Sequence, residues 1–249
     1  DRLLEDLTRL NDELELRVRQ RTAALVAANQ ELESFTYAVS HDLRAPVRAI
    51  SGFETALRED FADVLPADGL EFLDEIRTGA DRMNALIDGL LDLSRSSRGA
   101  LDYEQVDLGQ ICNEIFAQFR RDDASRNVTL TLDGDLQVSG DPRLLRTLMQ
   151  NLLENAWKYT EPCEVGAVRV YCADAADDGI CVEDNGIGFD PAFSHKLFDP
   201  FQRLHRHDEF PGIGIGLATA ARIVHRHGGQ IAGCGRPGQG ARFCFTLEE

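Results

Sequence analysis

The sequence lacks long apolar runs, and it lacks an excess of basic over acidic residues. No apolar run approaches the roughly 18 residues of a membrane-spanning helix, and the N-terminal residues are too highly charged for a signal peptide. Lys and Arg number 26 against 43 Asp and Glu, and the resulting formal net charge of −17 repels nucleic acids and anionic membranes. We expect a soluble protein with no nucleic-acid partner and no segment inserted in a membrane.

Cysteine pairs with metal-binding or redox spacing are also absent. The sequence contains no C-x-x-C motif, and most of its 6 cysteines lie inside apolar runs. This pattern favours reduced, buried thiols over a disulfide framework or a zinc site. The cysteines are Cys112, Cys163, Cys172, Cys181, Cys234 and Cys244.

Hydrophobic residues make up 43% of the chain, enough for the cores of one or two domains. Near the N-terminus they recur at steps of three, four and seven, the pattern of a coiled-coil seam. The alternative is a single amphipathic helix packed on its own domain, but we favour a dimeric rod over residues 1–34. The seam contains Leu7, Leu10, Leu14, Val18, Leu25, Leu32, Phe35 and Val39.

A break follows at residues 63–69, where Pro66 and Gly69 interrupt the helical pattern. A second apolar stripe then predicts another long helix. Two helices joined by a short loop form an antiparallel hairpin, and two hairpins would form a four-helix bundle. We therefore predict an all-α helical hairpin over residues 35–97. Its second stripe contains Leu73, Ile76, Ala80, Met83, Ile87 and Leu90.

The pattern changes again after residues 94–99, where short strands begin to alternate with helices. This alternation predicts an α/β two-layer sandwich over residues 98–249. Residues 189–211 are polar and irregular, which is typical of a lid or a disordered loop. The expected strands are 101–106, 128–132, 167–173, 179–183, 230–234 and 241–247, and the expected helices are 108–124, 142–159 and 215–227.

A polar stripe runs along the expected helix 142–159. Thr147, Asn151, Asn155 and Lys158 share one face of this helix. Carboxamide oxygens suit a divalent cation that keeps several waters and bridges phosphates, and the lysine can neutralise phosphate charge. The alternative is an ordinary solvated helix face.

A carboxylate and two glycine clusters follow this helix. Asp184 ends an apolar strand and precedes Gly186 and Gly188; it could accept a hydrogen bond from the amine of adenine, or simply form a tight turn. Residues 212–217 open a helix whose bare N–H groups can receive phosphates. They form neither a P-loop nor a dinucleotide fingerprint, because no Lys-Ser/Thr follows and Leu217 replaces the third glycine.

A histidine lies beside a carboxylate in the first helix. Neutral imidazole is nucleophilic, and Asp42 can hold the proton of one ring nitrogen of His41 so that the other nitrogen directs its lone pair outward. The alternative is a surface or core histidine without a chemical role.

Taken together, these residues resemble the motifs of sensor histidine kinases of bacterial two-component systems. The motifs occur in the order of that family and cover the chain from residue 35 to its end. They are an H box at 40–46, an N box at 151–160, a first glycine box at 184–188, an F box at 198–203 and a second glycine box at 212–217.

The resemblance implies a HisKA-type dimerisation and phosphotransfer domain followed by a catalytic domain of the GHKL (Bergerat) fold. It implies autophosphorylation with ATP and Mg²⁺, a homodimer joined through the bundle and coiled coil, an upstream sensor domain, and a response regulator that receives the phosphoryl group on an aspartate. The chain would be cytoplasmic, or the cytoplasmic part of a longer membrane-anchored or soluble sensor. A nucleotide-binding scaffold without activity and a protein-serine kinase are the rival interpretations, and the intact motifs and in-chain histidine argue against them.

Carried over residue by residue, the resemblance makes His41 the phospho-acceptor and Asp42 its base. Asn155 would be the magnesium ligand, supported by Asn151. The expected ATP-binding residues are Asn151, Asn155, Lys158, Tyr159, Asp184, Gly186, Gly188, Arg203, Gly212, Gly214, Gly216 and Leu217.

Two positions lead to further expectations. Members of the superfamily that hydrolyse ATP have a water-activating glutamate where this chain has Asn151. An amide cannot accept a proton from water, which fits an enzyme that transfers the phosphoryl group to a histidine instead of to water. Related kinases that dephosphorylate their regulator hold water with a Thr or Asn at the position of Ala45, so we predict weak phosphatase activity.

We expect the H-x-H pairs 205–207 and 225–227 to lie on a loop and a helix surface without binding metal.

Overall fold

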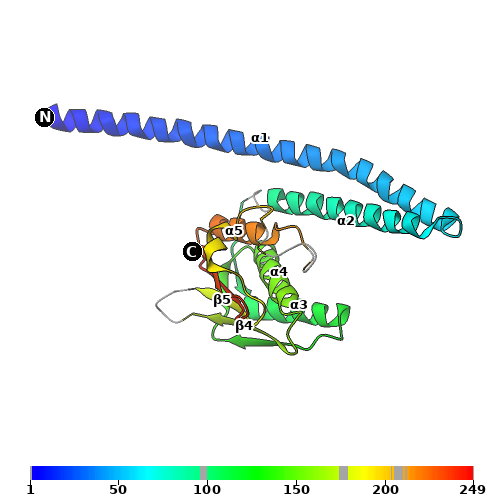
Figure 1. Cartoon of the computed structure of the whole chain (residues 1–249). Helices are drawn as coiled ribbons and strands as arrows, with labels where there is room; N and C mark the ends of the chain where they lie inside the picture. Colours follow the sequence, from blue (N-terminus) through cyan, green and yellow to red (C-terminus); the bar gives the residue numbers. More distant parts are fainter. Residues whose placement is uncertain are drawn as a thin grey trace. The chain divides into compact units, whose positions relative to one another are not determined.

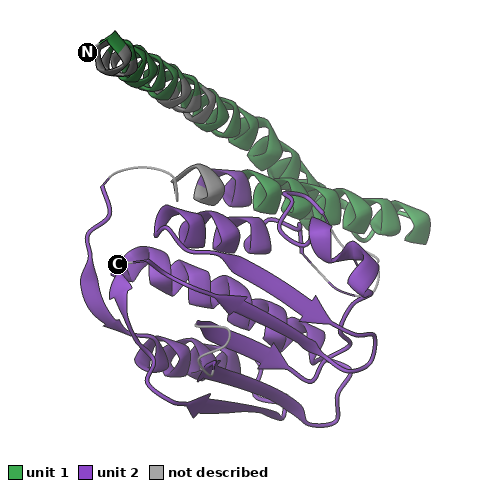
Figure 2. Ribbon diagram, turned by 90° about the vertical axis from the view of Figure 1, so that its left-hand side faces the viewer, with its two compact units in different colours: residues 1–87 green, residues 88–249 purple. Residues whose placement is uncertain are grey.

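The computed structural model describes residues 2–95, 100–173, 179–202, 204, 210 and 212–248. The chain forms two compact units, residues 1–87 and 88–249 (Figures 1 and 2). The first contains α1 (Arg2–Phe61) and most of α2 (Ala67–Arg95), which confirms the predicted helical hairpin. The finer division into 1–34, 35–97 and 98–249 stays a prediction. Among the described residues, no helix is sufficiently long and apolar to cross a membrane.

The two helices of the hairpin bury residues at seven-residue intervals. Only part of the apolar stripe predicted on α2 is buried, while Ile76 and Met83 are exposed. A matching exposed row on α1 contains Leu43, Ile50 and Leu57. The hairpin therefore has a second apolar face that its own residues do not cover. Within residues 2–87 the buried residues are Ser40, Val47 and Glu54 on α1 and Leu73, Ala80 and Ile87 on α2, and Leu91 is buried further along α2.

Charged side chains join the two helices near their connecting loop. The Arg58 guanidinium donates to the buried Glu54 carboxylate at 2.8 Å and to Asp74 of α2 at 2.9 Å. Arg77 donates to the same Asp74 carboxylate at 2.9 Å. The buried carboxylate is thus paired, as a charge removed from water must be.

The second unit is built on a five-stranded sheet with the strand order β2-β4-β5-β7-β6. Strands β2 and β4 are parallel, and the other neighbouring pairs are antiparallel. A separate antiparallel pair is formed by β1 and β3. The strands are β1 (Glu104–Asp107), β2 (Val128–Asp133), β3 (Gln137–Gly140), β4 (Gly166–Cys172), β5 (Ile180–Asp184), β6 (Ile231–Gly235) and β7 (Ala241–Phe245).

Helices cover one face of this sheet, which gives the predicted two-layer sandwich (Figure 2). They are α3 (Leu108–Asp122), α4 (Pro142–Tyr159) and α5 (Gly216–Arg226), accompanied by the 3-10 helix η1 (Pro191–Lys196). Alternate strand residues point toward the helices, so the core lies between the layers. Its members include Leu148, Leu152, Val168, Val170, Val182, Ile223, Phe243 and Phe245.

Local sequence explains where the helices begin. Asp107 precedes α3 and accepts the backbone N–H of Gln110 at 3.0 Å. Asp141 precedes α4 and accepts the N–H groups of Arg143 and Leu144, while Pro142 occupies the first turn. These caps fix α4, the helix that carries the polar stripe.

All predicted strands and helices of this unit form, with small differences at their ends. Strand β3 and helix η1 are additional, and η1 lies inside the segment that we predicted to be irregular. The sequence gives little signal for either, because both are short and neither has a clear apolar period.

The prediction that His227 lies on the surface is wrong. Its side chain is buried, and its ring bridges two elements: Nδ1 faces the Ile223 carbonyl at 2.8 Å, and Nε2 accepts the Asp141 N–H at 3.0 Å. The ring thereby ties the end of α5 to the cap of α4. His225 is exposed as predicted, while the pair at 205 and 207 lies outside the described residues.

The cysteine prediction is also wrong in part. Cys181 and Cys244 form a disulfide between β5 and β7. Of the free cysteines only Cys112 is buried, and burial raises the pKa of its thiol to about 12; Cys172 and Cys234 are exposed. The sequence could not indicate the disulfide, because its partners are 63 residues apart and meet through strand register.

Candidate functional site

Asp184 is a buried carboxyl group at the end of β5. Its side chain accepts the backbone N–H groups of Gly186 at 2.9 Å and Ala241 at 3.3 Å. Burial raises its pKa to about 6, although both hydrogen bonds act in the opposite direction. Because buried carboxyl groups that titrate near neutrality are common at binding sites, Asp184 is a strong candidate for ligand contact.

Gly186 and Gly188 allow the chain after Asp184 to lie against other backbone segments. A Cβ on Gly186 would collide with the carbonyl oxygen of Tyr159 at the end of α4. Gly188 has a φ of +61°, and a Cβ there would collide with the carbonyl oxygen of Arg236. The Ile187 N–H donates to the Tyr159 carbonyl at 3.1 Å, which fixes the turn beside α4. Both positions require glycine, because the backbone of other segments occupies the space that a Cβ would need.

The polar stripe of α4 meets the beginning of α5. The Asn151 amide donates to the Thr147 carbonyl at 2.8 Å, and a Cβ on Gly216 would lie 2.8 Å from Asn151 Oδ1. Asn155 is half-buried one helical turn further along. A carboxamide oxygen at that position can bind a hard cation that also contacts phosphates. Among the described residues, no group of three or more His, Cys, Asp and Glu side chains is placed to hold a metal ion.

Lys158 and Tyr159 continue the site toward the second glycine cluster. Lys158 Nζ lies 4.1 Å from the centroid of the Tyr159 ring, and it would lie 3.3 Å from a Cβ on Gly212. The Tyr159 ring packs edge-on against the buried ring of Phe210, with 5.2 Å between their centroids. We did not predict Phe210, because it lies in a segment without an apolar period.

The second glycine cluster shapes the entry to α5. Gly212 and Gly214 have φ values of +134° and +77°, which other residues rarely adopt. Ile215, at the N-cap of α5, provides no side-chain hydrogen bond to the first turn. The N–H groups of this turn therefore suit an anionic ligand. Leu217 packs against the core, and Arg203 lies outside the described residues.

His41 lies on α1 in the other unit. Its side chain is 73% exposed, and its Nδ1 lies 3.2 Å from Asp42 Oδ1. The neighbouring Ser40 is buried, so the helix is oriented with the imidazole in solvent. Ala45 is exposed one turn further along. The pairing through Nδ1 leaves Nε2 as the nitrogen that is available for a nucleophilic reaction.

Two family models match the chain. Residues 31–99 match the "His Kinase A (phospho-acceptor) domain", and residues 140–249 match the "Histidine kinase-, DNA gyrase B-, and HSP90-like ATPase". His41 falls in the first of these regions, and Asp184 and the polar stripe fall in the second.

Curated relatives cover nearly the whole chain. Cyanobacterial phytochrome A of Nostoc sp. is 33% identical over 224 residues, which are 90% of this chain and 29% of that protein. The methanogenesis regulatory histidine kinase FilI of Methanothrix harundinacea is 34% identical over 245 residues, 97% of this chain and 27% of that protein. The adaptive-response sensory kinase SasA of Thermosynechococcus vestitus is 32% identical over 254 residues, with coverages of 97% and 66%. The chain thus spans less than a third of the first two.

Solved structures agree in fold. Full-length ShkA in complex with AMPPNP has a TM-score of 0.60 and 22% identity, and the match covers 85% of this chain and 45% of that one. The Acinetobacter baumannii histidine kinase AdeS has a TM-score of 0.55 and 20% identity, with coverages of 84% and 97%.

Proposed function

Because this chain belongs to the sensor histidine kinase family, we propose that it is the kinase core of a two-component sensor. It transfers the γ-phosphoryl group of ATP to His41 and then to an aspartate of a response regulator. The observation that carries this proposal is the exposed His41 ring, which is paired through Nδ1 with Asp42. The same chain also matches the ATPase family model over residues 140–249.

The reaction at His41 follows from this pairing. Asp42 accepts the Nδ1–H, which keeps the lone pair of Nε2 directed outward. Nε2 attacks the γ-phosphorus, the bond to the bridging oxygen breaks, and ADP leaves with that oxygen. The Asp42 carboxylate offsets the positive charge that develops on the ring. Phosphoryl transfer needs little more from the protein than such positioning and charge compensation.

The residues of the second unit bind the nucleotide. The Asp184 carboxylate accepts the exocyclic amine of adenine, while the Tyr159 ring, packed on Phe210, forms an apolar wall for the base. Lys158 and the N–H groups at the start of α5 bind the phosphates. We assign Arg203 to the same phosphates from its motif.

Mg²⁺ would be held by Asn155, with Asn151 supporting it from the preceding turn. A carboxamide oxygen fits this ion, which prefers oxygen ligands and keeps several waters and phosphate oxygens in its shell. When bound, the ion neutralises phosphate charge. The Asn151 amide is held by its hydrogen bond to the Thr147 carbonyl and cannot act as a base toward water, which favours transfer to histidine over hydrolysis.

The exposed apolar row of the hairpin supports a homodimer. Leu43, Ile50 and Leu57 on α1 and Ile76 and Met83 on α2 are exposed in the single chain. A second hairpin would bury them in a four-helix bundle. The exposed seam residues Leu10, Leu14 and Val18 would likewise be covered in a parallel coiled coil.

Incubation with γ-labelled ATP and Mg²⁺ tests the proposal. We expect labelled protein whose phosphate is lost in acid and retained in base, because phosphohistidine is acid-labile. A binding scaffold would give no label, and a serine kinase would give acid-stable label on its partner. Asp184→Asn should slow the labelling at limiting ATP, whereas Asp190→Asn, an exposed carboxylate in the loop before η1, provides the control.

A further inference from the structure

The disulfide joins the same two strands that hold Asp184. Cys181 of β5 stands opposite Cys244 of β7, and Asp184 stands opposite Ala241 three residue pairs further along the same ladder. The intervening pairs are Val182 with Phe243 and Glu183 with Arg242. The disulfide therefore limits how far β5 and β7 can separate beside the proposed adenine site.

The position of Asp184 depends on this strand contact. Asp184 Oδ1 accepts the Ala241 N–H at 3.3 Å, which is beyond the usual range of such bonds. A Cβ on Gly240 would collide with the Asp184 carbonyl oxygen, so the two backbones lie close together here. Because the bond is already long, a small separation of the strands would break it and leave the Gly186 N–H as the remaining backbone donor to Asp184 Oδ1.

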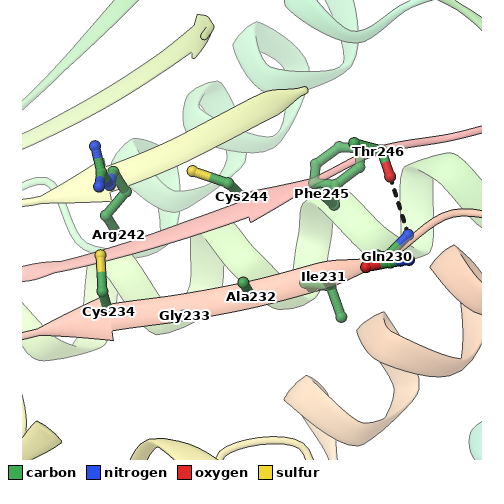
Figure 3. A pocket seen from close by; sticks show the side chains of 9 residues that line it. All are labelled: Gln230, Ile231, Ala232, Gly233, Cys234, Arg242, Cys244, Phe245 and Thr246. Carbon is green, nitrogen blue, oxygen red and sulfur yellow. Dashed lines mark hydrogen bonds between the residues drawn. The ribbon is translucent and has the colours of Figure 1, made fainter. Parts of the chain in front are cut away.

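The two cysteines of the disulfide differ in their exposure. Cys181 is 1% exposed, whereas Cys244 is half-buried and lines an open groove of about 430 Å³ over β6 and β7. Cys234 and Arg242 line the same groove (Figure 3). The remaining lining residues are Gln230, Ile231, Ala232, Gly233, Phe245 and Thr246. An external thiol therefore has its approach from the side of Cys244.

Arg242 places a cation at this groove, opposite the Glu183 carboxylate of β5. Its hydrogen bonds to Tyr171 and to Cys234 raise the pKa of the guanidinium, which stays charged at any working pH. The chain as a whole has a formal charge of −17 and repels anions. A cation beside Cys244 offsets that repulsion for an approaching thiolate.

We propose that the Cys181–Cys244 disulfide is a thiol–disulfide exchange site that controls nucleotide binding at Asp184 and is opened from the groove by a dithiol reductant. The reductant's thiolate attacks Cys244 Sγ, the disulfide breaks, and Cys181 leaves as a thiolate that takes up a proton. The second thiol of the reductant then attacks the mixed disulfide, so that Cys244 is released and the reductant becomes a disulfide.

Reduction frees β5 and β7 to separate at the Asp184–Ala241 pair, and nucleotide affinity falls. This step rests on the proposed function, because it takes Asp184 as the adenine contact. The expected loss is on the order of two- to tenfold in Kd, the effect of weakening one hydrogen bond.

The test compares nucleotide Kd values for the full chain before and after treatment with dithiothreitol. Thiol titration after denaturation should rise from 4 to 6 per chain, since 4 cysteines are free and 6 are present. The double variant Cys181→Val/Cys244→Val should have the nucleotide Kd of the reduced protein, and dithiothreitol should not change that Kd. Cys172→Ser, which removes an exposed free cysteine outside the groove and keeps the disulfide, should retain the full response.

An unchanged Kd in protein shown to have lost the disulfide would overturn the proposal, as would six thiols before treatment. Exchange of the Ala241 amide hydrogen provides a second readout that does not require nucleotide, and it should quicken on reduction. Failure of the oxidised protein to bind ATP would contradict the proposed function instead, while the amide measurement would still decide the coupling.

Discussion

The buried carboxyl of Asp184 should make nucleotide binding depend on pH near neutrality. Its pKa is raised to about 6, chiefly by burial, so the group is ionised at pH 7.5 and mostly protonated at pH 5. In the proposed site the ionised form accepts the amine of adenine, and protonation removes much of that capacity. Affinity should therefore fall as the pH falls through 6.

The size of the effect follows from the pKa. If only the carboxylate binds, Kd rises roughly tenfold between pH 7 and pH 5, since about nine-tenths of a group with a pKa near 6 is protonated at pH 5. Asp184→Asn removes the charged acceptor and should weaken binding about tenfold to a hundredfold at pH 7.5. The ratio of variant to wild-type Kd should then shrink about tenfold at pH 5, because the wild-type group has lost its charge as well.

Calorimetric titration with ADP between pH 5 and pH 8 measures this ratio. The ratio is the appropriate quantity because the nucleotide phosphates also titrate near pH 6, and their contribution is the same for both proteins. Glu183→Gln is the matched control: Glu183 is the exposed neighbour whose carboxylate accepts the Tyr171 hydroxyl. The Kd of this variant should depend on pH as the wild-type Kd does. Its midpoint should lie at a slightly lower pH, because the Glu183 charge that raises the pKa of Asp184 is gone. A ratio that stays constant across this range would refute the assignment of Asp184 to adenine.

Three further variants test other parts of the account. Asn155→Ala should weaken Mg-ATP binding more than binding of metal-free ATP in calorimetry; equal losses would exclude Asn155 as the metal ligand. Ala45→Thr should raise the rate of response-regulator dephosphorylation without changing ATP affinity, and strong phosphatase activity in the native protein would show that another residue holds the water. His227→Ala should lower the free energy of unfolding by about 2–5 kcal/mol in urea titrations, through a cavity and an unpaired Asp141 N–H; exposed His225→Ala should change it by less than about 0.5 kcal/mol, and similar losses in both would contradict the bridging role.

The sequence carried enough local signal to predict most of the fold. Helix α4 matches its prediction from Pro142 to Tyr159 because Asp141 caps it and its apolar period is regular. Strand β3 had no such signal, because its four residues depend on pairing with β1. The buried His227 ring, which bridges α5 and the cap of α4, could likewise not be predicted, since it depends on the packing of α5 against the beginning of α4.

The candidate site also combines residues that the sequence could indicate with contacts that it could not. Asp184 and the glycines could be identified because backbone turns require particular residues at particular spacings. Phe210, the Ala241 N–H and the disulfide could not, because each reaches the site through tertiary contacts. Sequence motifs thus indicated the candidate site groups better than the tertiary contacts that hold those groups in place.

The most direct test of the central claim is the location of the phosphoryl group after incubation with Mg-ATP. Peptide mapping by mass spectrometry at neutral to basic pH should place it on His41, and His41→Ala should remove the label while nucleotide affinity stays at the wild-type value. His225→Ala, an exposed histidine on α5, should label normally. Label that persists in His41→Ala at the wild-type level would contradict the account.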